Sequence, residues 1–210
     1  MSEYGDMTLD EYRNSLSSKE PTPGGGTAAA IALSQAAALA VMVSKLTLGS
    51  EKWENGWDGA NIASQIATPL LEKGHELALK DAHSFDGVMA AFKLPKRTDE
   101  ENKVRQDAIQ SGLLNAAMVP MQTAKHSYNL LQSLEELART GNANAVTDVG
   151  VSALLTTAAC KGALFNVEVN LISISAEICG SLQSEHDELK QKCREKAREI
   201  MHLVHERMHS

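Results

Sequence analysis

The stretch that decides the fold reads Pro21-Thr22-Pro23-Gly24-Gly25-Gly26-Thr27 and is followed by Ala28-Ala29-Ala30. Two prolines cannot continue a helix that precedes them, and three glycines permit backbone angles that are closed to other residues. We therefore expect Thr27 to cap a helix that runs through the alanines, with free backbone N–H groups in its first turn. Such a turn can receive a carboxylate, a phosphate or a polar ring edge, although the same residues also suit a plain loop before a core helix.

Outside this stretch, the composition predicts an all-α protein. Aromatic residues make up 4% of the 210 residues, whereas strand-rich folds depend on aromatic and β-branched side chains. No low-complexity linker and no internal repeat divides the chain, so residues 1–210 are expected to form a single-domain bundle of long antiparallel helices. The helices are expected at residues 8–18, 27–48, 60–93 with a bend at Pro69, 98–139 with a kink or restart at Pro120, 145–165, and 184–208, with a short break or kink at 166–171.

Charge and cysteine usage limit the partners that we expect. The formal net charge is -7, so no basic surface is available to displace the counterions of a nucleic acid. The three cysteines are odd in number and widely spaced, as is typical of reduced thiols in a cytoplasmic protein. The run Ala28–Leu48 has the length of a membrane span, but it contains Gln35 and Lys45. We therefore expect a buried helix there and no membrane partner.

One aspartate is a candidate for chemistry. Asp81 lies deep in the expected helix 60–93, within Leu79-Lys80-Asp81-Ala82-His83-Ser84-Phe85. An aspartate midway along a largely apolar helix is either part of a solvated stripe or buried for a chemical reason. Lys80 and Asp86 show that this helix has a polar face, so both interpretations remain open.

Two groups of amides are candidates for ligand binding. Asn142, Asn144 and Asp148 lie in a turn followed by an apolar helix, where amides can read the edge of a heterocycle and a carboxylate can receive an N–H. Helix capping by Asn144 or Thr147 would explain the same turn without a ligand. Asn166 and Asn170 share one helix face at i, i+4 and need hydrogen-bond partners if they are buried.

Metal and nucleotide sites are not expected. Three histidines share a face of the last helix, but this segment also carries arginines and glutamate and is expected to face solvent: His202, His205 and His209, with Arg198, Glu206 and Arg207. The triple glycine lacks the Gly-Lys-Ser/Thr that follows in a nucleotide phosphate loop.

Taken together, six segments resemble the formiminotransferase-cyclodeaminase C-terminal family, which includes stand-alone methenyltetrahydrofolate cyclohydrolases. They occur in the family's order and cover roughly residues 8–175: Pro21–Ala29, Met42–Gly49, Asp81–Phe85, Leu94–Lys96, Gly141–Gly150 and Asn166–Leu171. The resemblance implies an all-helical, homodimeric fold that binds a tetrahydrofolate derivative. It also implies no metal and no cofactor beyond the folate substrate.

The resemblance also implies roles for particular residues. Asp81 matches the family's catalytic proton acceptor. Family members often carry another acidic residue one or two positions earlier, where this chain has Leu79 and Lys80. Pairing with Lys80 would hold Asp81 ionised, and Asp81 is then either a base or a stabiliser of a cation. The expected substrate-binding residues are Gly24, Gly25, Gly26, Thr27, Lys96, Asn142, Asn144, Asp148, Asn166 and Asn170.

The family resemblance implies two related reactions. A cyclohydrolase adds water to 5,10-methenyltetrahydrofolate and gives 10-formyltetrahydrofolate. A cyclodeaminase converts 5-formiminotetrahydrofolate into the methenyl compound and ammonia. Because no formiminotransferase domain accompanies these residues, we expect the cyclohydrolase, with the cyclodeaminase as the alternative. A non-catalytic, folate-binding helical dimer is the alternative from another class.

Overall fold

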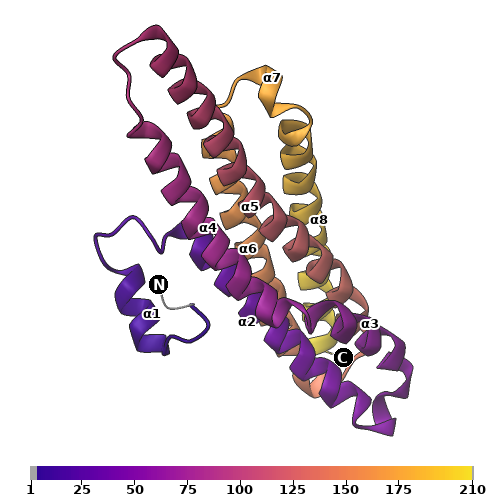
Figure 1. The fold of residues 1–210 in the computed structure, drawn as a ribbon. Coiled ribbons are helices and arrows are strands. Elements are labelled where there is room, and N and C mark those ends of the chain that lie inside the picture. Colours follow the sequence, from indigo (N-terminus) through magenta and orange to yellow (C-terminus); the bar gives the residue numbers. More distant parts are fainter. Residues whose placement is uncertain (1–3, 210) are drawn as a thin grey trace.

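The structure is a computed structural model that describes residues 4–209, apart from the side chain of Ala176 (Figure 1). The helices are α1 (Leu9–Leu16), α2 (Gly25–Leu48), α3 (Trp57–Ala67), α4 (Leu70–Phe92), α5 (Asp99–Thr140), α6 (Val146–Leu171), α7 (Ala176–Cys179) and α8 (Leu182–Met208). Two short 3-10 turns, Glu51–Gly56 and Ala143–Ala145, complete the elements. No strand occurs among the described residues, so the all-helical prediction is confirmed.

Five long helices, α2, α4, α5, α6 and α8, form the bundle, and each of them runs antiparallel to the next long helix in the chain. Contacts at both ends of α2 and α6 establish the direction of this pair: Gly25 lies against Asn166, whereas the backbone N–H of Asn142 donates to Thr47 Oγ1 at 3.0 Å. α2 is likewise antiparallel to α4, because the start of α2 meets Asp81 and Ser34 donates to the carbonyl of Leu71 at 2.7 Å. Each chain reversal therefore brings residues that are far apart in sequence to the same end of the bundle.

Helix α2 is central in the bundle, as its alanines predict. Its small side chains let neighbouring helices approach closely, and the exposed fraction of Ala30, Ala36 and Ala40 is 0%. Two helical stretches, Gly25–Leu48 and Ala143–Leu171, are long and apolar enough to cross a membrane by length and composition alone. In this fold, 61% and 50% of their most apolar windows are buried against other helices.

The helix boundaries differ from the predicted ones at three places. The expected helix 60–93 is two helices, because Pro69 lacks an N–H and becomes the N-cap of α4. At Pro120 the opposite occurs: α5 continues through the proline, which is buried in the bundle, although proline has no N–H for a helical hydrogen bond. The expected break at 166–171 is also absent, since α6 runs without interruption to Leu171.

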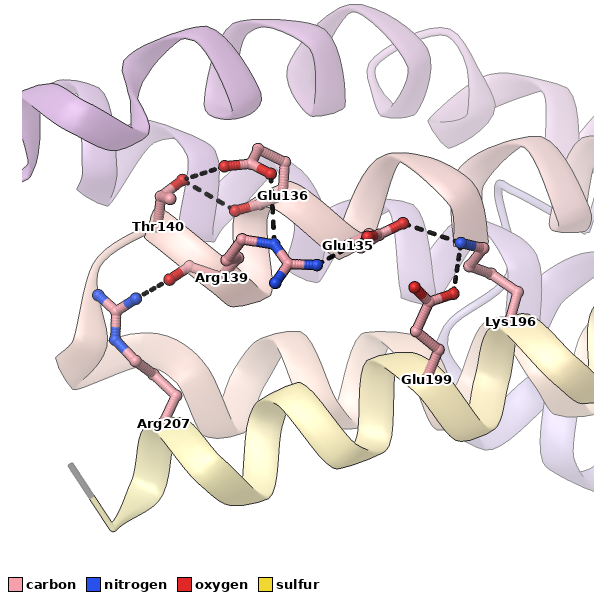
Figure 2. Close-up of polar contacts among 7 residues, drawn as sticks. All are labelled: Glu135, Glu136, Arg139, Thr140, Lys196, Glu199 and Arg207. Atoms are coloured by element: carbon pink, nitrogen blue, oxygen red, sulfur yellow. Dashed lines mark hydrogen bonds and ion pairs between the residues drawn. The ribbon is translucent and has the colours of Figure 1, made fainter.

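Polar contacts fasten the last helix to the end of α5 (Figure 2). Lys196 of α8 lies 2.8 Å from Glu135 of α5, and Glu135 also pairs with Arg139 at 2.9 Å. Arg207 donates to the backbone carbonyl of Arg139 and, at 3.0 Å, to that of Gly141. These contacts hold the turn between α5 and α6 against the C-terminal helix.

Candidate functional site

A cavity of about 240 Å³ lies where α2 begins, between α2, α4, α5 and α6. It gathers most of the residues that the sequence analysis proposed from separate segments. The cavity is lined by Pro21, Thr22, Gly24, Gly25, Gly26, Asp81, Ser84, Phe85, Val88, Ala116, Asn166 and Asn170. The glycine turn, the candidate aspartate and the second amide pair thus belong to one site.

The first turn of α2 presents its backbone N–H groups to this cavity. The helix starts at Gly25 with Gly24 as N-cap, so the prediction that Thr27 is the cap is wrong. The glycines enter the helix without strain, and its first backbone hydrogen bond runs from the N–H of Ala28 to the carbonyl of Gly24 at 2.9 Å. The three N–H groups before Ala28 therefore have no partner from within the helix.

Asp81 reaches the start of α2 from the neighbouring helix α4. The hydroxyl of Thr27 donates to Asp81 Oδ2 at 3.3 Å. This side chain therefore binds the carboxylate and does not cap the helix. A Cβ atom on Gly26 would lie 2.3 Å from Asp81 Oδ1 and 2.5 Å from Oδ2. Only glycine leaves room for the carboxylate at this position.

Burial dominates the electrostatics of Asp81. Removal from water raises the pKa of the Asp81 carboxyl, and hydrogen bonds from the hydroxyl and the backbone N–H of Thr27 partly oppose that rise. The expected pairing with Lys80 does not form: Lys80 is exposed, and Asp81 has no ion pair among the described residues. The site therefore holds a single carboxylate that is partly removed from water and has no ion-pair partner among the described residues.

We expect Thr27→Val to move the acid limb of the pH–rate profile to higher pH. Valine has the shape of threonine but cannot donate, so the variant loses a hydrogen bond that lowers the pKa of Asp81. If Asp81 must be ionised for activity, activity falls as the pH drops through the pKa of Asp81. A higher pKa therefore brings this loss at a higher pH. Thr27→Ser, which keeps the hydroxyl, is the control, and equal acid limbs in both variants would count against the role of this hydrogen bond.

Asn166 and Asn170 of α6 both line the cavity. Their amide nitrogens are already used: Asn166 donates to the carbonyl of Gly162 at 2.9 Å, and Asn170 donates to those of Ala116 and Asn166 at 3.1 and 2.7 Å. The bonds to Gly162 and Asn166 reach back one turn within α6, which continues through the residues where a break was expected. The amide oxygens accept no hydrogen bond from the described residues, which leaves them as acceptors for a ligand.

The first amide group lies at the opposite end of the bundle. Asn142, Asn144 and Asp148 surround the start of α6, and the side chain of Asn142 donates to the carbonyl of Leu46 at the end of α2. Asp148 and Asn166 are 18 positions apart on α6, or about 27 Å along its axis. Because α2 and α6 are antiparallel, the starts of these two helices are far apart, and within one chain this turn does not line the cavity.

Two further residues differ from what the sequence predicts: Lys96 lies outside the cavity wall, and Tyr4 lies close to Asp81. Lys96 lies in the exposed connection between α4 and α5 and is not part of the cavity wall. Tyr4, with 9% of its surface exposed, packs edge-to-face with Tyr12 and is close enough to Asp81 and Asp86 for their charges to help burial raise its pKa. No sequence pattern pointed to Tyr4.

Other wall residues could have been found from the sequence. Ser84, Phe85 and Val88 follow Asp81 at i+3, i+4 and i+7, so helical periodicity alone places them on its face. Ala116 belongs to a different helix and carries no such signal.

The chemistry of the cavity follows from its wall. One half-buried carboxylate, two amide side chains with unused oxygens and the apolar side chains of Phe85 and Val88 favour a flat ligand that carries N–H donors and positive charge. The carboxylate can also accept a proton from a bound reactant. No group of three histidine, cysteine, aspartate or glutamate side chains suitable for a metal ion occurs in the part of the chain that the structure describes.

Comparisons with known proteins give this cavity a context. The family model of formiminotransferase-cyclodeaminase matches residues 8–200. The methenyltetrahydrofolate cyclohydrolase of Methylorubrum extorquens is 36% identical over 166 residues, which cover 79% of this chain and 80% of that protein. The formimidoyltransferase-cyclodeaminase of Gallus gallus is 38% identical over 172 residues, or 80% of this chain, but the match spans only 31% of the longer protein.

A solved structure shows the same fold. The crystal structure of formiminotetrahydrofolate cyclodeaminase from Thermotoga maritima superposes with a TM-score of 0.85 at 27% identity. The superposition covers 96% of this chain and 97% of the other.

Proposed function

The chain belongs to the formiminotransferase-cyclodeaminase family, and we propose that it is a folate one-carbon enzyme, a methenyltetrahydrofolate cyclohydrolase. The similarity to the Methylorubrum cyclohydrolase extends over most of both chains, which favours this activity. The observation that carries the proposal is the half-buried carboxylate of Asp81, which has no cationic partner among the described residues and lies in a cavity lined by two asparagines.

The proposed reaction requires a proton acceptor and a stabiliser of positive charge. Water attacks the methenyl carbon, which carries a cation shared between N5 and N10, and Asp81 accepts the proton that the water loses. The resulting tetrahedral carbon then opens: its hydroxyl proton leaves, the C–N5 bond breaks, and N5 takes up a proton to give the 10-formyl product. A general base is typically worth about 10²–10⁴-fold, and the same carboxylate attracts the cation before the attack.

The binding residues have supporting roles in this proposal. The amide oxygens of Asn166 and Asn170 are suited to accept hydrogen bonds from N–H groups on the edge of the pterin ring. The exposed Gly25 leaves space on the cavity side of α2, because the nearest atom to a Cβ there is Asn166 Nδ2 at 3.8 Å. Its φ angle is not positive, so close approach of the ligand, rather than an unusual backbone angle, is the use we propose for this glycine.

The direct test is an assay with 5,10-methenyltetrahydrofolate. The expected result is a loss of its near-ultraviolet absorbance that is faster than the spontaneous rate and proportional to protein concentration. A rate equal to that of the buffer alone would exclude the cyclohydrolase.

The second candidate activity is that of a formiminotetrahydrofolate cyclodeaminase. The superposition with the Thermotoga protein over nearly the full length of both chains favours it. In this reaction N10 attacks the carbon of the protonated formimino group, and Asp81 accepts the N10 proton. The carboxyl then gives this proton to the amino group on the tetrahedral carbon, the bond from that carbon to the amino group breaks, and ammonia leaves the methenyl cation behind. Ammonia release from 5-formiminotetrahydrofolate separates this activity from the first, and a protein that binds folate but gives neither product would be the non-catalytic alternative.

We propose further that the chain forms a homodimer through the outer faces of α2 and α6. An exposed, mostly apolar stripe runs along α6 from Val151 to Ile172, which follows its last residue, and it includes the charged Lys161. Phe165 is 65% exposed and Ile172 is 80% exposed. Its other apolar members are Val151, Leu154, Ala158 and Val169, and α2, which packs against α6, exposes Ala38, Met42 and Leu46. Pairing of two identical faces is the commonest way to bury such a surface.

Light scattering at micromolar concentration tests the homodimer. We expect about twice the 22.6 kDa chain mass for the wild type, because the stripe is too apolar to remain in water. Ala158→Arg, which places a charge in the middle of the stripe, should shift the mass toward that of the single chain. A wild-type mass of one chain with full activity would refute the dimer.

A further inference from the structure

A second cavity lies between α6 and α8, which pack against each other. It measures about 440 Å³ and has no wall residue in common with the cavity at Asp81. We call it the α6–α8 groove. On each helix its wall residues follow the spacing i, i+3, i+4 and i+7, which is one helix face: Lys161, Leu164, Phe165 and Glu168 on α6, and Asp187, Lys190, Gln191 and Arg194 on α8. Its volume is in the range of small-molecule sites.

The two helices run antiparallel along the groove. Lys190, in the first part of α8, donates to Glu168 near the end of α6 at 3.2 Å. Farther along the pair, a Cβ on Gly150 near the start of α6 would lie 3.1 Å from the side chain of Val204 in α8. Later positions of α8 therefore lie level with earlier positions of α6.

The groove consequently has one cationic end and one acidic end. Lys161 is the first wall residue of α6 and Arg194 is the last of α8, so these two cations lie at the same end. Glu168 and Asp187 lie together at the opposite end for the same reason. Lys161 and Glu168 are seven positions apart, or about 10 Å along the helix axis.

The acidic end is satisfied within the chain. Glu168 accepts a hydrogen bond from Lys190. Asp187 Oδ1 lies 2.8 Å from Nδ1 of the buried His186, and the amide of Gln183 donates to the same carboxylate at 3.2 Å. The hydrogen bond with His186, and then that from Gln183, lower the pKa of Asp187, so this carboxylate is ionised and already bound. The acidic end therefore needs no ligand.

The cationic end has no such partners. Lys161 and Arg194 are exposed and form no hydrogen bond or ion pair with any described residue. By contrast, Lys196, two positions after Arg194, binds both Glu135 and Glu199 (Figure 2). The chain has 27 acidic residues against 20 lysines and arginines, so a shortage of carboxylates is not the reason. Two like charges at one end of a groove repel each other, and an anion bound between them would remove this repulsion.

We infer that the α6–α8 groove binds a small organic anion, with its carboxylate or phosphate group between Lys161 and Arg194. The guanidinium group of an arginine matches two oxygens of either anion, and the lysine adds a second positive charge. The apolar part of the ligand lies on Phe165, which is 65% exposed, and on the neighbouring Leu164. An aromatic ring is suited to stack on Phe165.

This site also gives a use to the charge of Lys161. The residue interrupts the otherwise apolar stripe of α6 that we propose for the homodimer, and the stripe shares Lys161 and Phe165 with the groove. The groove therefore lies along the edge of that stripe, on the side of α8. The inference goes beyond the proposed reaction, because the groove uses no residue of the cavity at Asp81.

Calorimetric titration with phenyl phosphate tests the site. This probe carries a ring and a dianion, whereas inorganic phosphate has only the charge and phenol only the ring. We expect one phenyl phosphate per chain, bound at least about tenfold more tightly than either of the other two, because it alone uses both parts of the groove. Benzoate carries a carboxylate in place of the phosphate, and the tighter of the two aryl anions identifies the charged group that the groove prefers.

Two substitutions locate the binding. Arg194→Gln and Lys161→Gln each remove one charge from the cationic end, and each is expected to weaken the binding of phenyl phosphate at least about tenfold through loss of a charge-assisted hydrogen bond. Arg198→Gln is the matched control. Arg198 is exposed on α8 one turn after Arg194, forms no hydrogen bond or ion pair with a described residue, and does not line the groove. We expect this variant to bind as the wild type does.

Any of four results would overturn the inference. The first two are no saturable binding of phenyl phosphate at millimolar concentration and equal binding of inorganic phosphate and phenyl phosphate. The others are wild-type affinity in Arg194→Gln and equal losses in Arg194→Gln and Arg198→Gln, which would indicate a general attraction by charge. All three substitutions change exposed side chains, and circular dichroism checks that each variant is folded. Because turnover is not measured, failure of this site and failure of the proposed reaction are distinguishable.

Discussion

Asp81→Asn is expected to lower turnover at least about 100-fold while the fold stays intact. Asparagine has nearly the same shape but cannot accept a proton, so the water or amine that attacks the one-carbon unit loses its base. It also removes the negative charge that attracts the cationic substrate. The measurement is the turnover on methenyltetrahydrofolate together with the helical signal in circular dichroism. Activity within a few-fold of the wild type, at unchanged helicity, would contradict the role of Asp81 as the base.

The same variant should be at least as stable as the wild type at neutral pH. Burial raises the pKa of Asp81, so the folded protein favours the protonated form more than the unfolded chain does. The contribution of this group to stability is therefore greatest at low pH and declines as the pH rises through the folded pKa. Asparagine is neutral throughout and removes the cost of the buried charge. Thermal melting at neutral pH is the check, and a clearly lower Tm would indicate that the carboxylate has a structural role.

Gly26→Ala is expected to cause the second large loss, at least about tenfold in turnover. Its Cβ would lie only 2.3 to 2.6 Å from the carboxyl oxygens and carbon of Asp81, too close for any real contact. The carboxylate must then move away from Thr27 and from the first turn of α2. Because alanine is a better helix former than glycine, the loss of activity should not come with a loss of helix.

Gly87→Ala is the matched control for this substitution. Gly87 lies in α4, as Asp81 does, but a Cβ there would meet no atom within 4 Å. We expect this variant to keep wild-type turnover and to gain a few tenths of a kcal/mol, up to about 1 kcal/mol, from the better helix propensity. Equal activity in Gly26→Ala and Gly87→Ala would contradict the requirement for space beside Asp81.

The local features of the fold could be predicted from neighbouring residues. Both capping boxes form, at Thr8 with Glu11 and at Thr98 with Glu101, because the side chains involved are three positions apart. The alanine-rich helix after the glycine turn was predicted to be buried and is central in the bundle. The candidate aspartate and the second amide pair were proposed from separate segments, and the structure brings them to one cavity.

By itself, the sequence determined the helical class, the family resemblance and the identity of the polar groups, since these depend on composition and on spacing within one turn of helix. Only the tertiary structure decided that α5 continues through Pro120 and that the Asn142–Asp148 turn lies away from the cavity. It also decided that Asp81 accepts hydrogen bonds from Thr27 at the start of α2, where Thr27 was expected to cap the helix. Each of these outcomes depends on which helices pack together and in which direction. That choice comes from burying whole helix faces against residues far away in the chain, and no short stretch of sequence contains it.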